Sequence, residues 1–154
     1  MTIEDDIAFL ERIATLRQLG APALRILAIG AESYRVDEGQ VLFVAGEATD
    51  GAYIVQEGSF TLLPETGGEA AVVAGPGTLL GESALLAETR RPATATAREN
   101  ATVLRISRAM FLKMLESFPD AAARLREVIA ARTNEWARDM ENIRTALVDG
   151  SKPH

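Results

Sequence analysis

Leu80-Gly81-Glu82-Ser83-Ala84-Leu85-Leu86 is followed, three residues later, by Arg90-Arg91-Pro92-Ala93-Thr94-Ala95-Thr96-Ala97. Gly81 permits a close approach between the backbone and a ligand. Residues 82–87 predict one helical turn whose unpaired amide groups, at the positive end of the helix dipole, can face an anion. Arg91 adds a permanently charged planar fork that can donate two hydrogen bonds to phosphate oxygens. Together the two segments predict a phosphate-binding site.

The carboxylate of Glu82 indicates what else the ligand carries. A carboxylate beside a phosphate would repel it, so this side chain makes sense only beside a neutral hydroxyl group. A ribose 2′-hydroxyl is the obvious donor. The pattern therefore favours a nucleotide over inorganic phosphate.

The two segments resemble the phosphate-binding cassette of the cyclic nucleotide-binding domain family, in which a Gly-Glu-x-Ala-Leu turn and short helix precede an Arg-x-Ala segment that enters a strand. The order of segments around them resembles this family over nearly the whole chain. The resemblance implies that Glu82 holds the ribose and that Arg91 holds the phosphate. It also implies contacts from neighbouring residues of both segments, which are Gly81, Ser83, Ala84, Pro92 and Ala93.

Two positions depart from the usual pattern of the family. Pro92 stands where the family often has Ala, Ser or Thr, and proline offers neither an amide hydrogen nor a hydroxyl. Because a threonine at this position tends to accompany cGMP in the family, its absence favours cAMP and leaves cGMP open. Ser83 replaces the usual apolar residue after the glutamate, and it either has no effect or adds a hydroxyl contact.

The cassette lies within a region, residues 31–107, in which short β-rich runs alternate with Gly, Asp, Glu and Pro. Strands at this spacing are typical of a barrel, roll or sandwich. With the resemblance, they predict an α+β fold built on an antiparallel β-roll, that is, a double-stranded β-helix or jelly roll. The expected strands cover residues 34–36, 41–44, 52–56, 59–63, 70–73, 93–97 and 102–106.

Helices are expected on both sides of this roll. In residues 1–30, apolar residues at spacings of three and four predict a helix over 3–16, capped by Thr2, and Pro22 and Gly30 bound a second helix over 22–29. In residues 108–149, a helix over 108–118 is separated by Pro119 from a long one that runs, after Asp120, to about residue 148. We read residues 1–149 as a single domain and residues 150–154 as a tail.

The last helix carries an apolar stripe close to a heptad repeat, formed by Ile129, Trp136, Met140, Ile143 and Leu147. These side chains either pack against the roll or pair with a second copy of the chain in a homodimer. The family resemblance also places the last helix over the ligand, without fixing which residue meets the base. The candidate base contacts are Arg132, Thr133 and Trp136.

The amino-acid composition and net charge argue against several kinds of site and partner. The 154 residues include no cysteine, and the one histidine is the last residue, so thiol chemistry and histidine-rich metal sites are excluded from the expected fold. A formal net charge of −6 argues against DNA binding. No apolar run approaches the roughly 18 residues that a membrane span needs. We expect no metal, no cofactor and no membrane contact, and a cytoplasmic location.

The leading interpretation is a regulatory module without enzymatic activity, in which a cyclic nucleotide drives a conformational switch that an unknown downstream protein reads. One alternative keeps the fold without the ligand, as a structural or dimerisation module. The presence of both Glu82 and Arg91 argues against it. Another alternative is a cupin-like enzyme, which would need the cluster of metal-binding histidines that this sequence lacks.

Overall fold

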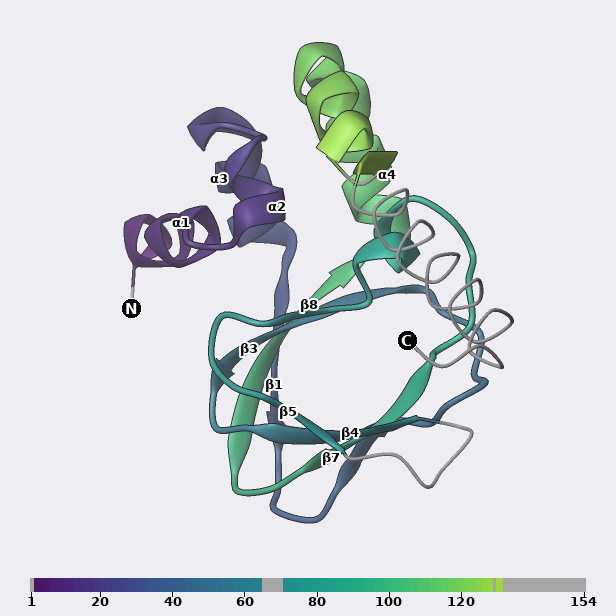
Figure 1. The fold of residues 1–154 in the computed structure, drawn as a ribbon. Coiled ribbons are helices and arrows are strands. Elements are labelled where there is room, and N and C mark those ends of the chain that lie inside the picture. Colours follow the sequence, from purple (N-terminus) through teal and green to yellow (C-terminus); the bar gives the residue numbers. More distant parts are fainter. Residues whose placement is uncertain (1, 65–70, 129, 132–154) are drawn as a thin grey trace, which may run out of the picture.

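A computed structural model describes residues 2–64, 71–128, 130 and 131 of the chain. The strands among them form two four-stranded antiparallel sheets that face each other as a roll (Figure 1). One sheet has the order β1-β8-β3-β6, and the other has the order β2-β7-β4-β5. The strands are β1 (Glu32–Val36), β2 (Val41–Phe43), β3 (Gly51–Glu57), β4 (Phe60–Pro64), β5 (Val72–Ala74), β6 (Leu79–Leu80), β7 (Ala93–Ala97) and β8 (Ala101–Ser107). The predicted fold class is confirmed.

The side chains of the strands alternate between two cores, as the period of a β-strand requires. Along β8, Ala101 and Val103 belong to the core inside the roll, whereas Leu104 and Ile106 belong to the core under the helices. β3 divides in the same way, with Val55 inside the roll and Ile54 under the helices. The two central strands of this sheet, β3 and β8, therefore contribute to a core on each face, whereas β1 at its edge is mostly exposed.

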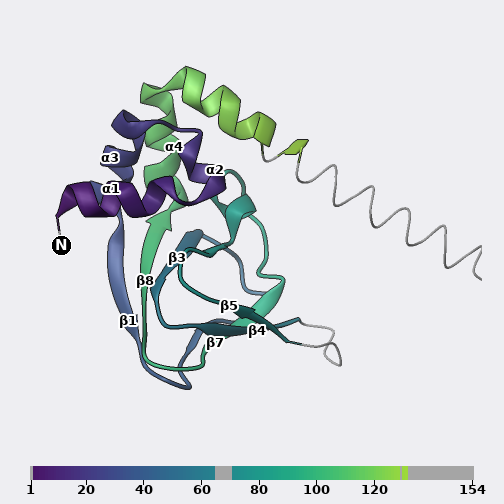
Figure 2. The ribbon, with the colours of Figure 1, turned by 60° about the vertical axis from the view of Figure 1, so that its left-hand side comes forward.

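The helices gather at one end of the roll, against the sheet that contains β3 and β8 (Figures 1 and 2). Their apolar faces, including Leu10, Leu24 and Phe111, meet the outer face of that sheet in one core. The helices are α1 (Ile3–Glu11), α2 (Ala14–Arg17), α3 (Ala21–Gly30), the short 3₁₀ helix η1 (Glu82–Leu85) and α4 (Arg108–Ser117), and residues 119–128 are also helical. Within the described part of the chain, no helix is long and apolar enough to cross a membrane.

The predicted helix over residues 3–16 is wrong in one respect, because the chain breaks it into α1 and α2. Ile13 has an extended backbone (φ −88°, ψ 115°) and forms the N-cap of α2. The apolar spacing runs through the break because Ile13 and Leu16 stay buried on the side of Leu10. The predicted cap at Thr2 is confirmed, since its side chain accepts a hydrogen bond from the Asp5 amide.

Other boundaries differ by a few residues. β1 begins at Glu32 and β5 spans Val72–Ala74, and the two-residue strand β6 was not expected at all. Phe118 interrupts the helices with a non-helical backbone (φ −135°, ψ 70°), so the predicted separation at Pro119 is confirmed. The predicted continuation to about residue 148 and the tail at 150–154 lie outside the described residues.

Candidate functional site

Arg91 lies inside the roll, immediately before β7, with only 5% of its surface exposed. Its guanidinium carbon is 4.4 Å from the ring centroid of Phe43 and 5.5 Å from that of Tyr53. The two rings stack with their centroids 6.0 Å apart. Nη2 of Arg91 donates a hydrogen bond of 2.9 Å to the carbonyl oxygen of Gly51. Aromatic faces and one carbonyl therefore hold the guanidinium in place.

The other terminal nitrogen of Arg91, Nη1, is buried and has no hydrogen-bond partner in the part of the chain that the structure describes. It lies directly beside the turn at Gly81, because a Cβ built on Gly81 would come within 2.5 Å of it. Gly81 also has φ +88°, where other residues are strained. Only glycine leaves room for this nitrogen.

The charge of Arg91 is costly where it lies. Burial lowers the pKa of its guanidinium from the ordinary value, against the opposing effects of Tyr53, Asp50 and Glu47. An arginine nevertheless stays protonated in a protein. A buried, charged donor without an acceptor is uncommon, because such groups are normally paired. The arrangement suits an anionic acceptor that reaches both Nη1 and the backbone of the Gly81 turn from one side.

The segment after Gly81 forms a shorter helix than predicted. The helical turn expected over 82–87 is a 3₁₀ helix over Glu82–Leu85, and Leu86 is its C-cap. The amide of Ala84 donates to the carbonyl of Gly81 at 3.0 Å. The carbonyls of Ala84 and Ala87 accept hydrogen bonds from the guanidinium of Arg108, which holds the end of the turn from outside.

Glu82 is tied to the N-terminal helices. Its carboxylate accepts a hydrogen bond from the hydroxyl of Thr15, a residue of α2 that is 2% exposed. Thr15 was not predicted as a site residue, because the two residues are 67 positions apart in the sequence and no pattern connects them. Any hydroxyl group of a ligand that approached Glu82 would meet a carboxylate that already has a donor.

Main-chain hydrogen bonds hold the backbone of Arg91 against the loop before β3. The amide of Gly46 donates to the carbonyl of Arg91, and the amide of Arg91 donates to the carbonyl of Glu47, both at 2.8 Å. Arg90, by contrast, is exposed and donates to the carbonyl of Gly46. Of the two adjacent arginines, only Arg91 enters the roll.

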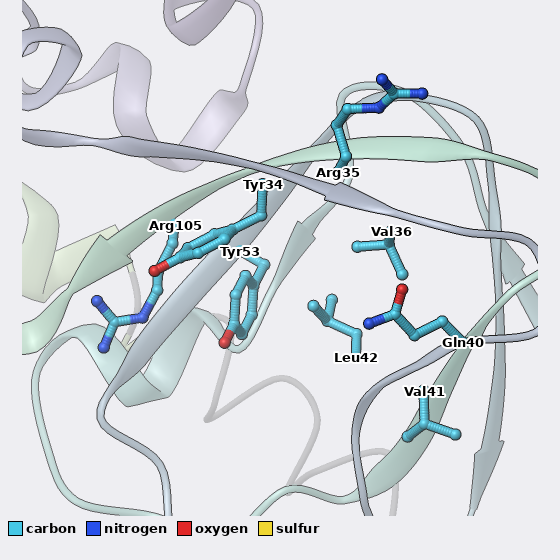
Figure 3. A pocket seen from close by; sticks show the side chains of 8 residues that line it. All are labelled: Tyr34, Arg35, Val36, Gln40, Val41, Leu42, Tyr53 and Arg105. Carbon is cyan, nitrogen blue, oxygen red and sulfur yellow. The ribbon is translucent and has the colours of Figure 1, made fainter.

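Tyr53 also lines a cavity of about 320 Å³ between β1, β2 and β8 (Figure 3). In this view Arg35 extends away from the other labelled side chains, while Tyr34 and Arg105 lie on the side of Tyr53. Nη2 of Arg105 is 2.6 Å from Asp50 Oδ2, so its charge is paired. Arg35 is exposed, so among the described residues this cavity lacks the buried unpaired donor that Arg91 presents.

The structure thus brings Gly81 and Arg91 together as the sequence predicted, and places Glu82 beside Thr15. Ser83 and Pro92 are exposed, and Ala93 is half-buried at the start of β7. Their contacts with a ligand stay predictions. The described residues contain no group of three or more histidine, cysteine or acidic side chains placed to hold a metal ion. The candidate base contacts Arg132, Thr133 and Trp136 lie outside the described residues.

Comparisons with known proteins agree in finding similarity to cyclic nucleotide-binding proteins. A family model described as "Cyclic nucleotide-binding domain" matches residues 34–118. A solved cyclic nucleotide-binding-like protein from Brucella abortus is 38% identical, with a TM-score of 0.64, over 73% of this chain and 98% of that one. The cyclic AMP receptor protein of Thermus thermophilus is 33% identical over 101 residues, which are 64% of this chain and 47% of the receptor.

Other relatives are much longer. The lysophospholipase NTE1 of Pyricularia oryzae is 28% identical over 111 residues, which are 70% of this chain and 7% of that protein. The chain therefore spans less than half the length of these two curated relatives.

Proposed function

The chain belongs to the cyclic nucleotide-binding domain family, and from this premise we propose that it binds a cyclic nucleotide, cAMP in preference to cGMP, as a regulatory module without enzymatic activity. The observation that carries the proposal is Nη1 of Arg91, a buried charged donor without a partner among the described residues, beside the Gly81 turn. A cyclic phosphodiester carries one negative charge and exocyclic oxygens that accept hydrogen bonds. Such a ligand would satisfy the donor and neutralise the charge.

Glu82 distinguishes a nucleotide from a simple phosphate in this proposal. It follows Gly81 directly, and its carboxylate can accept a second hydrogen bond in addition to the one from Thr15. A ribose 2′-hydroxyl provides that donor without charge repulsion. The preference for cAMP rests on Pro92, which offers no hydroxyl to a guanine base and no amide hydrogen to the phosphate.

Regulation is the second part of the proposal. A ligand switches a protein only if it binds one conformation more tightly than another. The proposed site has contacts with both parts of the fold, since Arg91 contacts Phe43 and Tyr53 of the roll and Glu82 contacts Thr15 of the N-terminal helices. We expect ligand binding to alter how the helices sit on the roll, and an unidentified downstream protein to read that change. A homodimer through the last helix and a cytoplasmic location stay predictions.

Calorimetric titration with cAMP and with cGMP tests the proposal. We expect one-site binding that Arg91→Ala weakens by more than about 100-fold, since a buried phosphate would lose its charged partner. Arg90→Ala is the matched control, because this neighbouring arginine is exposed, and we expect it to change the affinity by less than about threefold. Thermal unfolding of each variant verifies that it is folded.

Two outcomes would count against the proposal. If the folded wild-type chain bound neither nucleotide at millimolar concentrations, a ligand-free structural module would be the better description. If Arg90→Ala and Arg91→Ala weakened binding equally, the nucleotide would bind elsewhere, through general charge attraction.

A further inference from the structure

Arg108, the first residue of α4, makes an unusually large number of hydrogen bonds to the region of the site. Its Nη1 donates to the carbonyls of Ala84 (2.9 Å) and Ala87 (3.0 Å) and to the hydroxyl of Thr49 (3.2 Å). Its Nη2 donates to the carbonyl of Thr49 at 2.7 Å. One guanidinium therefore joins three segments of the chain: the η1 turn, the loop before β3 and the start of α4.

Three of these four acceptors are main-chain carbonyls, and the fourth, the Thr49 hydroxyl, also accepts from the Thr89 amide. A helix cannot satisfy its last carbonyls with its own amides, and η1 spans only Glu82–Leu85. Thr49 is 5% exposed, so its carbonyl has little access to water. Arginine suits this position because its planar fork presents several donors in fixed directions, whereas lysine carries a single flexible ammonium group.

The bonds of Arg108 continue directly to those of Arg91. Nη2 of Arg108 donates to the carbonyl of Thr49, and the backbone amide of Arg108 donates to the carbonyl of Asp50 at 2.8 Å. Nη2 of Arg91 donates to the next carbonyl, that of Gly51, at 2.9 Å. Three consecutive carbonyls thus connect the two arginines. Gly51 itself packs directly against β8, because a Cβ on Gly51 would lie 2.2 Å from the carbonyl oxygen of Ile106.

We propose that Arg108 is a positioning residue for the anion site: it fixes the η1 turn and the stretch Thr49–Gly51 at the start of α4, so that Gly81 and Arg91 are already in place when the ligand arrives. This inference rests on the proposed function. Arg108 contacts the ligand's site only through other residues. Its loss therefore lowers affinity by loosening the turn, since the ligand must then order it on binding.

The test compares Arg108→Gln and Arg108→Lys with Arg124→Gln. Arg124 is the matched control, because its guanidinium also donates to a main-chain carbonyl, that of Gln18, outside the site. Two quantities are measured at a temperature well below unfolding: the dissociation constant of cAMP by calorimetry, and amide hydrogen exchange of the ligand-free chain in peptides covering residues 82–91.

We expect Arg108→Gln to weaken cAMP binding about tenfold, and to speed exchange in the peptides covering 82–91, because several charged hydrogen bonds are lost. Arg108→Lys should restore part of the cAMP affinity and part of the protection from exchange. Arg124→Gln should leave the affinity and the exchange rate unchanged. Exchange in peptides covering β4 should be the same in all variants.

The inference is overturned if Arg108→Gln melts at a lower temperature but binds cAMP as the wild type does, with unchanged exchange in residues 82–91. Arg108 would then stabilise the fold without positioning the site. Should Arg108→Gln not fold, the same two measurements on Arg108→Lys decide the matter. A wild-type chain that bound no cyclic nucleotide would overturn the proposed function itself, and this inference with it.

Discussion

Replacing Gly81 with alanine separates backbone strain from damage to the anion site. The substitution puts a side chain on a residue with φ +88°, and it puts that Cβ 2.5 Å from Nη1 of Arg91. Gly77 is a matched control, since it has the same φ of +88° but no atom within 4 Å of its would-be Cβ. Gly77→Ala therefore introduces the strain alone.

The expected magnitudes follow from these two contacts. The left-handed backbone costs about 1–2 kcal/mol in either alanine variant. In Gly81→Ala the guanidinium must also move, which breaks its hydrogen bond to Gly51 and costs about 1.5–3 kcal/mol more, the range for a bond to a charged group. We thus expect unfolding free energies lower by about 1–2 kcal/mol for Gly77→Ala and about 2.5–5 kcal/mol for Gly81→Ala.

The effect on binding should differ even more. Urea titration gives the unfolding free energy of each variant, and calorimetry gives its dissociation constant for cAMP. The displacement of Arg91 in Gly81→Ala should weaken cAMP about 10- to 100-fold, since each 1.4 kcal/mol is about a factor of ten. Gly77→Ala should bind as the wild type does. Equal losses of stability in the two variants, with cAMP affinity intact in both, would refute the assignment of Gly81 and Arg91 to one site.

Two further predictions concern Thr15 and Tyr34. Thr15→Val removes a hydroxyl that donates to Glu82, which leaves the carboxylate a stronger acceptor for a ribose hydroxyl: calorimetry should show tighter cAMP binding, by up to about tenfold, and unchanged binding of 2′-deoxy-cAMP, whereas weaker cAMP binding would mean that Thr15 orients Glu82 instead. The hydrogen bond from Tyr34 to Glu32, together with the charge of Glu32, raises the pKa of Tyr34 above its ordinary value. Because the folded chain then keeps this proton at a pH where the unfolded chain has lost it, the contribution to stability disappears as the pH rises through the pKa of Tyr34. Absorbance titration of the Tyr53→Phe chain should show that pKa falling when Glu32→Ala is added, and no change would rule out Glu32 as its cause.

The part of the site that could be predicted from sequence is the part encoded in one short segment. Gly81 and Arg91 lie ten positions apart, and the order of their neighbours is itself a pattern, so their meeting was expected. The strands were predictable for a related reason, because turn residues recur between β-rich runs. β6 was not predicted, because a strand of two residues is too short to show the alternation of apolar and polar residues.

The rest depends on contacts that leave no mark on sequence. Apolar spacing predicted burial at Ile13 and Leu16 correctly, but burial is the same whether the chain continues as one helix or breaks and restarts on the same side. The bond from Thr15 to Glu82 joins residues far apart, and a buried threonine is common in any core. The carbonyls of the stretch Thr49–Gly51 are present in every sequence, so nothing about residues 49 and 50 could single them out.

That same property gives the stretch Thr49–Gly51 an unusual evolutionary freedom. Replacing a side chain at residue 49 or 50 can remove the bond to the Thr49 hydroxyl, but it leaves the main-chain oxygens that accept from Arg108 and Arg91. The exposed side chain of Asp50 can therefore change while both guanidinium groups keep their main-chain acceptors. Selection for these hydrogen bonds therefore acts on the donors Arg91 and Arg108 and on Gly51. Homologous chains with an altered affinity for the nucleotide should differ at these positions.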